Sequence, residues 1–106
     1  MIEFLVCNII TYLKIPNKIK IGGKTWGIII GNLRKEAGSP DFGMCFSSQQ
    51  RIWISNEAHQ EQQEASFIHE ILEAIKFEND LEMTHQTLQT LAEQLYQVLK
   101  DNQLLK

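Results

Sequence analysis

The chain contains few cysteines, the residues whose disulfides stabilise small secreted proteins. Its 106 residues include only two cysteines, Cys7 and Cys45, which are far from a Cys-x-x-Cys spacing. This excludes a disulfide framework and a cysteine-based zinc knuckle. Apolar runs such as 4–7 and 28–30 are only a few residues long, whereas a membrane span needs about 20. Glu3 stands where a signal peptide has Lys or Arg. We therefore expect a cytoplasmic protein without a membrane segment.

A large excess of one charge is also lacking, since the net charge is −3. The total conceals an asymmetry: residues 1–53 carry seven Lys or Arg against three acids, and residues 54–106 carry three against ten. The lysines of the first half alternate with isoleucines in a strand pattern. Such alternation is typical of the solvated face of a sheet. Nucleic acid is therefore not an expected partner.

The chain does contain enough apolar residues, 43%, for one globular domain. The hydrophobic period is two up to about residue 55, which predicts strands. Short connections favour antiparallel pairing. We expect an α+β fold, with a small antiparallel sheet of three or four strands followed by two helices. The predicted strands lie at Lys18–Ile21, Lys24–Ile30, Phe42–Phe46 and up to Ile54, with Gly22-Gly23 as a tight turn and Asn32–Pro40 as a loop.

Beyond residue 55 the period becomes helical. Ser55 or Asn56 is the expected N-cap of a first helix, whose apolar stripe runs to about Phe77. Asn79-Asp80 interrupts the pattern, and Thr84 is the expected cap of a second helix. We expect these helices and the sheet to form a single domain over residues 15–106.

Residues 1–14 precede the predicted strands, and we expect them to form an N-terminal arm outside the domain. Apolar residues at 2, 5, 6, 9 and 13 fit one face of a short helix, which Pro16 ends. We expect this helix to pack on the sheet; the alternative is a flexible arm or one that forms a dimer.

The candidate functional residues lie in the first helix, in the sequence His69-Glu70-Ile-Leu-Glu73. Positions 69 and 73 are one helical turn apart, so both side chains can reach one metal ion. The motif resembles His-Glu-x-x-His, but Glu73 replaces the second histidine. His85, at the start of the second helix, lies on the stripe that faces the first helix. The alternative interpretation is a solvated helix edge with His69 packed beside Leu72.

Two imidazoles and one carboxylate are a ligand set of catalytic zinc sites, which keep a fourth position open. We therefore predict a zinc site at His69, Glu73 and His85. Glu70 would be the general base, because a carboxylate beside the metal can accept a proton from water.

Four segments resemble small phage and prophage proteins described as zincin-like metallopeptidases, akin to a minimal SprT-like or ImmA/IrrE-type core. The resemblance spans about residues 15–102, and members show His-Glu-x-x-His or His-Glu-x-x-Glu at the helix. It implies a zincin-like fold, zinc on His69, Glu73 and His85, and Glu70 as the base. The segments are Ile15–Lys24, Ile52–Ile54, Ile68–Ile75 and Leu95–Asn102.

The expected function is hydrolysis of peptide bonds by a phage-derived zinc metallopeptidase in the bacterial cytoplasm. The alternative is a non-catalytic phage binding module, or an inhibitor of a host protein, that retains the zincin scaffold. The expected partner is a peptide, a protein substrate or a host protein. The strand Gly43–Phe46 is expected at the sheet edge, with Phe42, Met44 and Phe46 toward the core and Cys45 outward. It would bind a peptide as an added strand, or form a homodimer.

Overall fold

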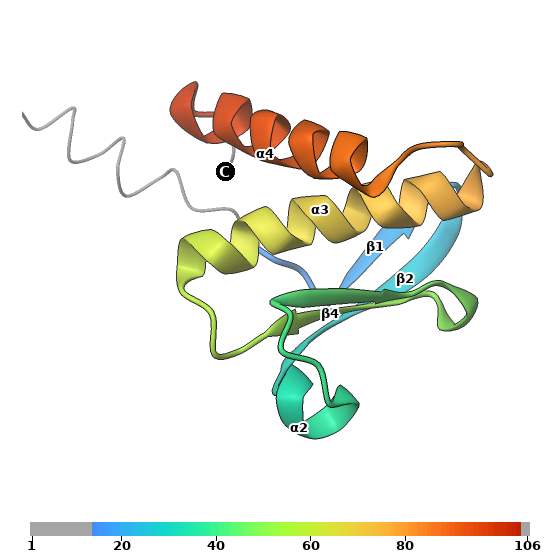
Figure 1. Cartoon of the computed structure of the whole chain (residues 1–106), viewed down its shortest axis with the longest axis vertical. Coiled ribbons are helices and arrows are strands. Elements are labelled where there is room, and N and C mark those ends of the chain that lie inside the picture. Colours follow the sequence, from blue (N-terminus) through green and yellow to red (C-terminus); the bar gives the residue numbers. More distant parts are fainter. Residues whose placement is uncertain (1–13, 105–106) are drawn as a thin grey trace, which may run out of the picture.

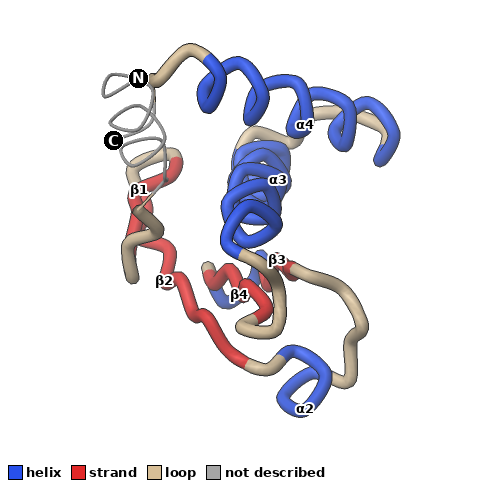
Figure 2. The backbone as a smooth tube through the Cα atoms, turned by 90° about the vertical axis from the view of Figure 1, so that its left-hand side faces the viewer, coloured by secondary structure: helices blue, strands red, loops and turns tan. Residues whose placement is uncertain are grey.

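A computed structural model describes residues 14–104, which form a sheet and two long helices stacked in three layers. Figure 1 shows α3 lying across the sheet and α4 lying on the far side of α3. Figure 2 gives the same stacking from the side. The elements are β1 (Lys18–Ile21), β2 (Lys24–Gly31), α2 (Leu33–Ala37), β3 (Gly43–Phe46), the 3₁₀ turn η1 (Ser47–Gln49), β4 (Arg51–Ser55), α3 (Gln60–Glu78) and α4 (His85–Asp101).

The sheet is mixed, in the order β1-β2-β4-β3. The pairs β1–β2 and β3–β4 are antiparallel, but β2 and β4 run parallel. The α+β class and the four strands are thus confirmed, whereas the expectation of an antiparallel sheet is wrong at its centre. The physical reason is the long connection of residues 32–50, which crosses over and returns the chain beside β2 in the same direction.

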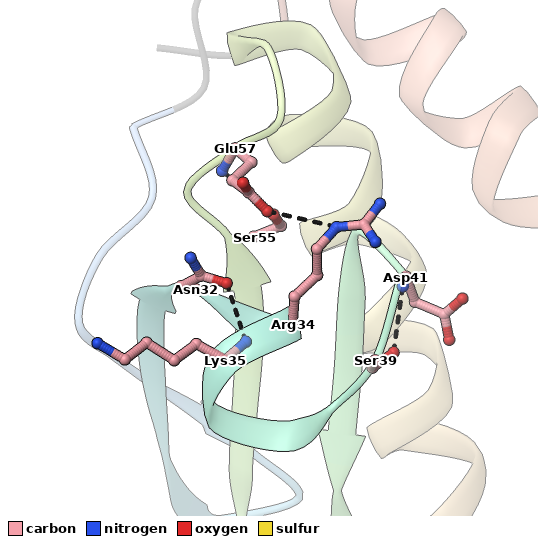
Figure 3. A network of polar contacts seen from close by, with 7 residues as sticks. All are labelled: Asn32, Arg34, Lys35, Ser39, Asp41, Ser55 and Glu57. Carbon is pink, nitrogen blue, oxygen red and sulfur yellow. Dashed lines mark hydrogen bonds and ion pairs between the residues drawn. The ribbon is translucent and has the colours of Figure 1, made fainter.

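This connection contains a short helix, α2, where the sequence predicted only a loop. The Asn32 side chain caps it by accepting a hydrogen bond from the Lys35 backbone N–H at 3.0 Å. Gly38 ends it with a φ of 65°, in the left-handed region that glycine tolerates. Leu33 is buried and anchors the helix on the sheet. Figure 3 shows α2 with its polar contacts.

The core lies between the inner face of the sheet and α3. Ile52 and Ile54 are fully buried, whereas Trp53 between them points to the other face, as the alternation predicted. Trp26 of β2 and Phe67 of α3 complete the centre of this cluster.

The structure confirms the predicted N-cap of α4 but not that of α3. The N-cap of α3 is His59, not Ser55 or Asn56, because Ser55 is the last residue of β4 and pairs with Gly31. The Ser55 hydroxyl oxygen instead accepts a hydrogen bond from the Glu57 N–H in the following turn. Thr84 caps α4 as predicted, accepting from the Thr87 N–H at 3.1 Å.

The predicted arm, residues 1–14, lies outside the described residues except for Lys14. None of the helices in residues 14–104 combines the length and the apolar character that a membrane span requires.

Ile54→Ala tests the importance of the buried strand β4. We expect the free energy of unfolding to fall by about 2–5 kcal/mol, because the substitution leaves a cavity beneath α3. The matched control is Ile30→Ala on the adjoining strand, where the side chain is 47% exposed. It should cost less than about 1 kcal/mol. Urea unfolding monitored by circular dichroism measures both, and equal losses would contradict this description of the core.

Candidate functional site

A cavity of about 690 Å³ lies along α3, between β3 and α4. We call it the groove. Both β3 and α4 pack on α3, which therefore lies between them. The groove is lined by residues of three segments: the β3 segment (Asp41, Phe42, Gly43, Met44 and Cys45), α3 (Gln62, Ala65, Ser66, His69, Glu70 and Glu73) and α4 (His85, Gln89, Ala92 and Glu93).

The groove brings together two histidines that are distant in the sequence. His69 is in the middle of α3 and His85 is the first residue of α4, and their ring centroids are 5.7 Å apart with the planes tilted by 60°. Two imidazoles bound tetrahedrally to one zinc ion, with Zn–N bonds near 2 Å, have centroids about 5 Å apart. The observed separation is therefore close to what a shared zinc ion requires.

The third predicted ligand, Glu73, also lines the groove, one turn beyond His69 on α3. Over residues 14–104, however, no three side chains of His, Cys, Asp or Glu are grouped as a metal site requires. The structure thus pairs the two histidines and places Glu73 in the same cavity. It does not assemble the three side chains into a finished ligand set.

The side chain of Glu70 is buried in the floor of the groove, between α3 and β3. Burial raises the pKa of Glu70 to about 8, and the negative charges of Glu73 and Asp41 add to this effect. The carboxyl group therefore keeps its proton at neutral pH. A cation in the groove would offset these effects and favour the carboxylate, the form that can act as a base.

The pKa of His69 is shifted in the opposite direction to that of Glu70. Burial lowers the pKa of His69, while the carboxylate of Glu73 partly opposes the shift and His85 adds to it. The imidazole is consequently neutral at pH 7 and keeps a lone pair on one ring nitrogen, as a metal ligand must.

The strand β3 forms one side of the groove and is an edge of the sheet, as predicted. In the described part of the chain it pairs only with β4. The Phe42 carbonyl accepts a hydrogen bond from the Ser55 N–H. Because alternate residues of an antiparallel strand turn toward the partner, the backbone groups of Gly43 and Cys45 point to the open edge.

The predicted side-chain orientation of β3 is wrong. Cys45 lies opposite Ile52 and packs against the core, whereas Met44 lies opposite Trp53 on the outer face. The alternation of large residues was misleading because β3 is short and partly buried on both faces. As a result Cys45 faces the groove.

Gly43 allows β3 to approach α3 closely at Glu70. A Cβ atom at this position would lie 3.1 Å from Glu70 Oε2 and 3.3 Å from Ser66 Cβ. The missing side chain at this position therefore makes room for the protein's own helix α3. Asp41, Cys45 and Glu93 could not be identified as groove residues from the sequence, since no spacing links them to the histidines.

Comparisons with models of protein families, with curated proteins and with solved structures found no match to this chain.

Proposed function

We propose that this protein is a zinc-dependent peptidase whose zinc ligands are His69, Glu73 and His85 and whose proton acceptor is Glu70. One observation carries the proposal: two histidines at a separation suited to a shared zinc ion lie beside a buried glutamate, in a cavity bordered by an open strand edge. The donor set of two imidazoles and one carboxylate suits zinc better than magnesium. Glu73 is one turn from His69 on α3, and its side chain would have to reorient to reach the same ion.

Each part of the groove would then have a separate role. Bound zinc would supply a Lewis acid and lower the pKa of water toward about 7. Glu70, held between Gly43 and Ser66, would accept the proton of the attacking water and pass it to the leaving amine. Its buried position limits competition from bulk solvent.

The open edge of β3 would bind the substrate. The outward backbone groups of Gly43 and Cys45 can pair with an extended peptide, as in strand addition to other sheets. Such pairing holds the peptide backbone along the groove without selecting side chains.

A specific observation also favours a second candidate, a peptide-binding module without catalysis. The three predicted ligands are not grouped as a metal site in the described residues, yet the open edge and the cavity beside it need no metal to bind a peptide. This alternative keeps the role of β3 and omits those of Glu70 and the histidines.

Zinc uptake separates the two candidates. Protein prepared without a histidine tag and stripped with a chelator should bind one zinc ion per chain, measured by competition with a chromophoric chelator and by elemental analysis. Magnesium should not compete, because the donor set contains two imidazoles. Absence of zinc binding would refute the peptidase and leave the binding module.

A further inference from the structure

The groove is larger than a metal centre needs. Its volume of about 690 Å³ is within the range of about 300–1,000 Å³ that is typical of ligand pockets. The proposed zinc ligands and Glu70 account for part of its lining only. Two charged residues without a role in that centre, Asp41 and Glu93, lie on its opposite walls.

These two residues make the groove strongly acidic. Of the residues that line it within 14–104, four are carboxylic acids and none is Lys or Arg. Zinc would offset the charge of Glu73, but those of Asp41 and Glu93 would remain.

Neither Asp41 nor Glu93 forms an ion pair with a described residue, although Arg34 and Asp41 line a second, smaller cavity together. Arg34, on the neighbouring α2, pairs with Glu57 at 3.6 Å. Figure 3 shows the Asp41 carboxylate pointing away from this ion pair. Lys100 on α4 pairs with Glu61 at 3.1 Å. Glu93 accepts a hydrogen bond from the Gln89 amide at 2.6 Å, which leaves its negative charge in place.

We propose that the groove selects a basic peptide: an extended segment paired with β3 that places a lysine or arginine side chain between Asp41 and Glu93. The edge of β3 supplies the backbone contacts, and the two carboxylates supply the charge complementarity. A groove with negatively charged walls raises the association rate of a positively charged peptide and favours it over neutral or acidic peptides. This inference rests on the proposed function in taking a peptide as the ligand.

The test uses three peptides that differ at one position, Ac-Ala-Val-Xaa-Val-Ala-NH₂ with Lys, Gln or Glu as Xaa. Each is titrated into the full chain, with and without zinc, and followed by the shifts of backbone amide signals in NMR. We expect the Lys peptide to bind about tenfold more tightly than the Glu peptide, a difference of about 1.4 kcal/mol. The advantage should shrink as salt is raised. The shifts should concentrate at Gly43–Phe46 and around Glu93.

Matched variants identify the source of the preference. Asp41→Asn with Glu93→Gln should bring the Lys and Glu peptides within about twofold of each other. Glu36→Gln with Glu82→Gln removes the same amount of charge outside the groove and should preserve the preference. Equal binding of the three peptides, or a preference that survives in the first double variant, would overturn the inference.

The zinc measurement keeps this outcome separate from that of the proposed function. Zinc binding and hydrolysis without a preference for Lys would overturn the basic-peptide inference alone. A preference for Lys that disappears in the Asp41 and Glu93 variant, in protein that binds no zinc, would support this inference and refute the peptidase.

Discussion

Glu70→Gln is expected to reduce peptide hydrolysis by about 10²–10⁴-fold, because an amide cannot accept the proton of the attacking water. Zinc content should not change, since Glu70 is not among the proposed ligands. The measurement is cleavage of a labelled basic peptide by zinc-loaded protein. Glu61→Gln is the control: its carboxylate is on the same helix but is exposed and pairs with Lys100. Full activity in Glu70→Gln would contradict the role assigned to this residue.

The same variant tests the burial of Glu70 through the pH dependence of the free energy of unfolding. The pKa of Glu70 is raised from 4.5 to about 8 by burial, so unfolding releases its proton at intermediate pH. Stability of the zinc-free wild type should consequently fall as pH rises from about 4.5 to about 8, because of this group. Glu70→Gln removes the buried ionisable group and should lack that loss. Urea unfolding at pH 5 and pH 8 compares the two proteins.

His69→Ala and His85→Ala should each weaken zinc binding by about 100-fold or more, since each removes one of the proposed ligands. Both variants should also lose hydrolysis. Competition titration with a chromophoric chelator gives the affinities, and circular dichroism checks that α3 and α4 remain folded.

The matched control for these variants is the third histidine of the chain. His59 caps the start of α3 through its backbone, makes no side-chain capping bond and lies outside the groove. His59→Ala should retain the zinc affinity of the wild type. Equal loss in all three variants, or no loss at His69 and His85, would contradict the proposed ligand set.

Local patterns were sufficient for most of the elements but not for their order in the sheet. Gly22-Gly23 and the alternation on either side predicted the first hairpin, and both glycines have positive φ. The parallel pairing of β2 with β4 could not be predicted in this way, because it depends on the path of residues 32–50. Asn32, which caps α2, is a local signal for this helix within the segment predicted as a loop.

The candidate site was predictable where helical geometry determines distances. Spacing along one helix related His69 to Glu73, and the apolar stripe of α4 correctly placed His85 toward α3. The contribution of β3 to the site could not be predicted from spacing. The side of the sheet on which Cys45 lies and the distance from Gly43 to Glu70 both depend on strand register. No periodic pattern in a four-residue strand determines that register.

The attachment of α4 has a consequence for access to the groove. Only Leu88 and Ala92 of this helix are buried, and the neighbouring Leu91, Leu95 and Val98 are 41–48% exposed. Toward its C-terminal end α4 is also held by the Tyr96 hydroxyl, which donates a hydrogen bond to Glu64, and by the ion pair of Lys100 with Glu61. The end that carries His85 has neither contact, and a segment with few buried side chains opens at a lower free energy than the whole domain. α4 carries His85 and Glu93, whereas β3 is fixed in the sheet by β4. Outward swings of α4 would therefore widen the groove and separate His85 from His69, so that entry of a bulky ligand and release of the proposed zinc ion would share one motion.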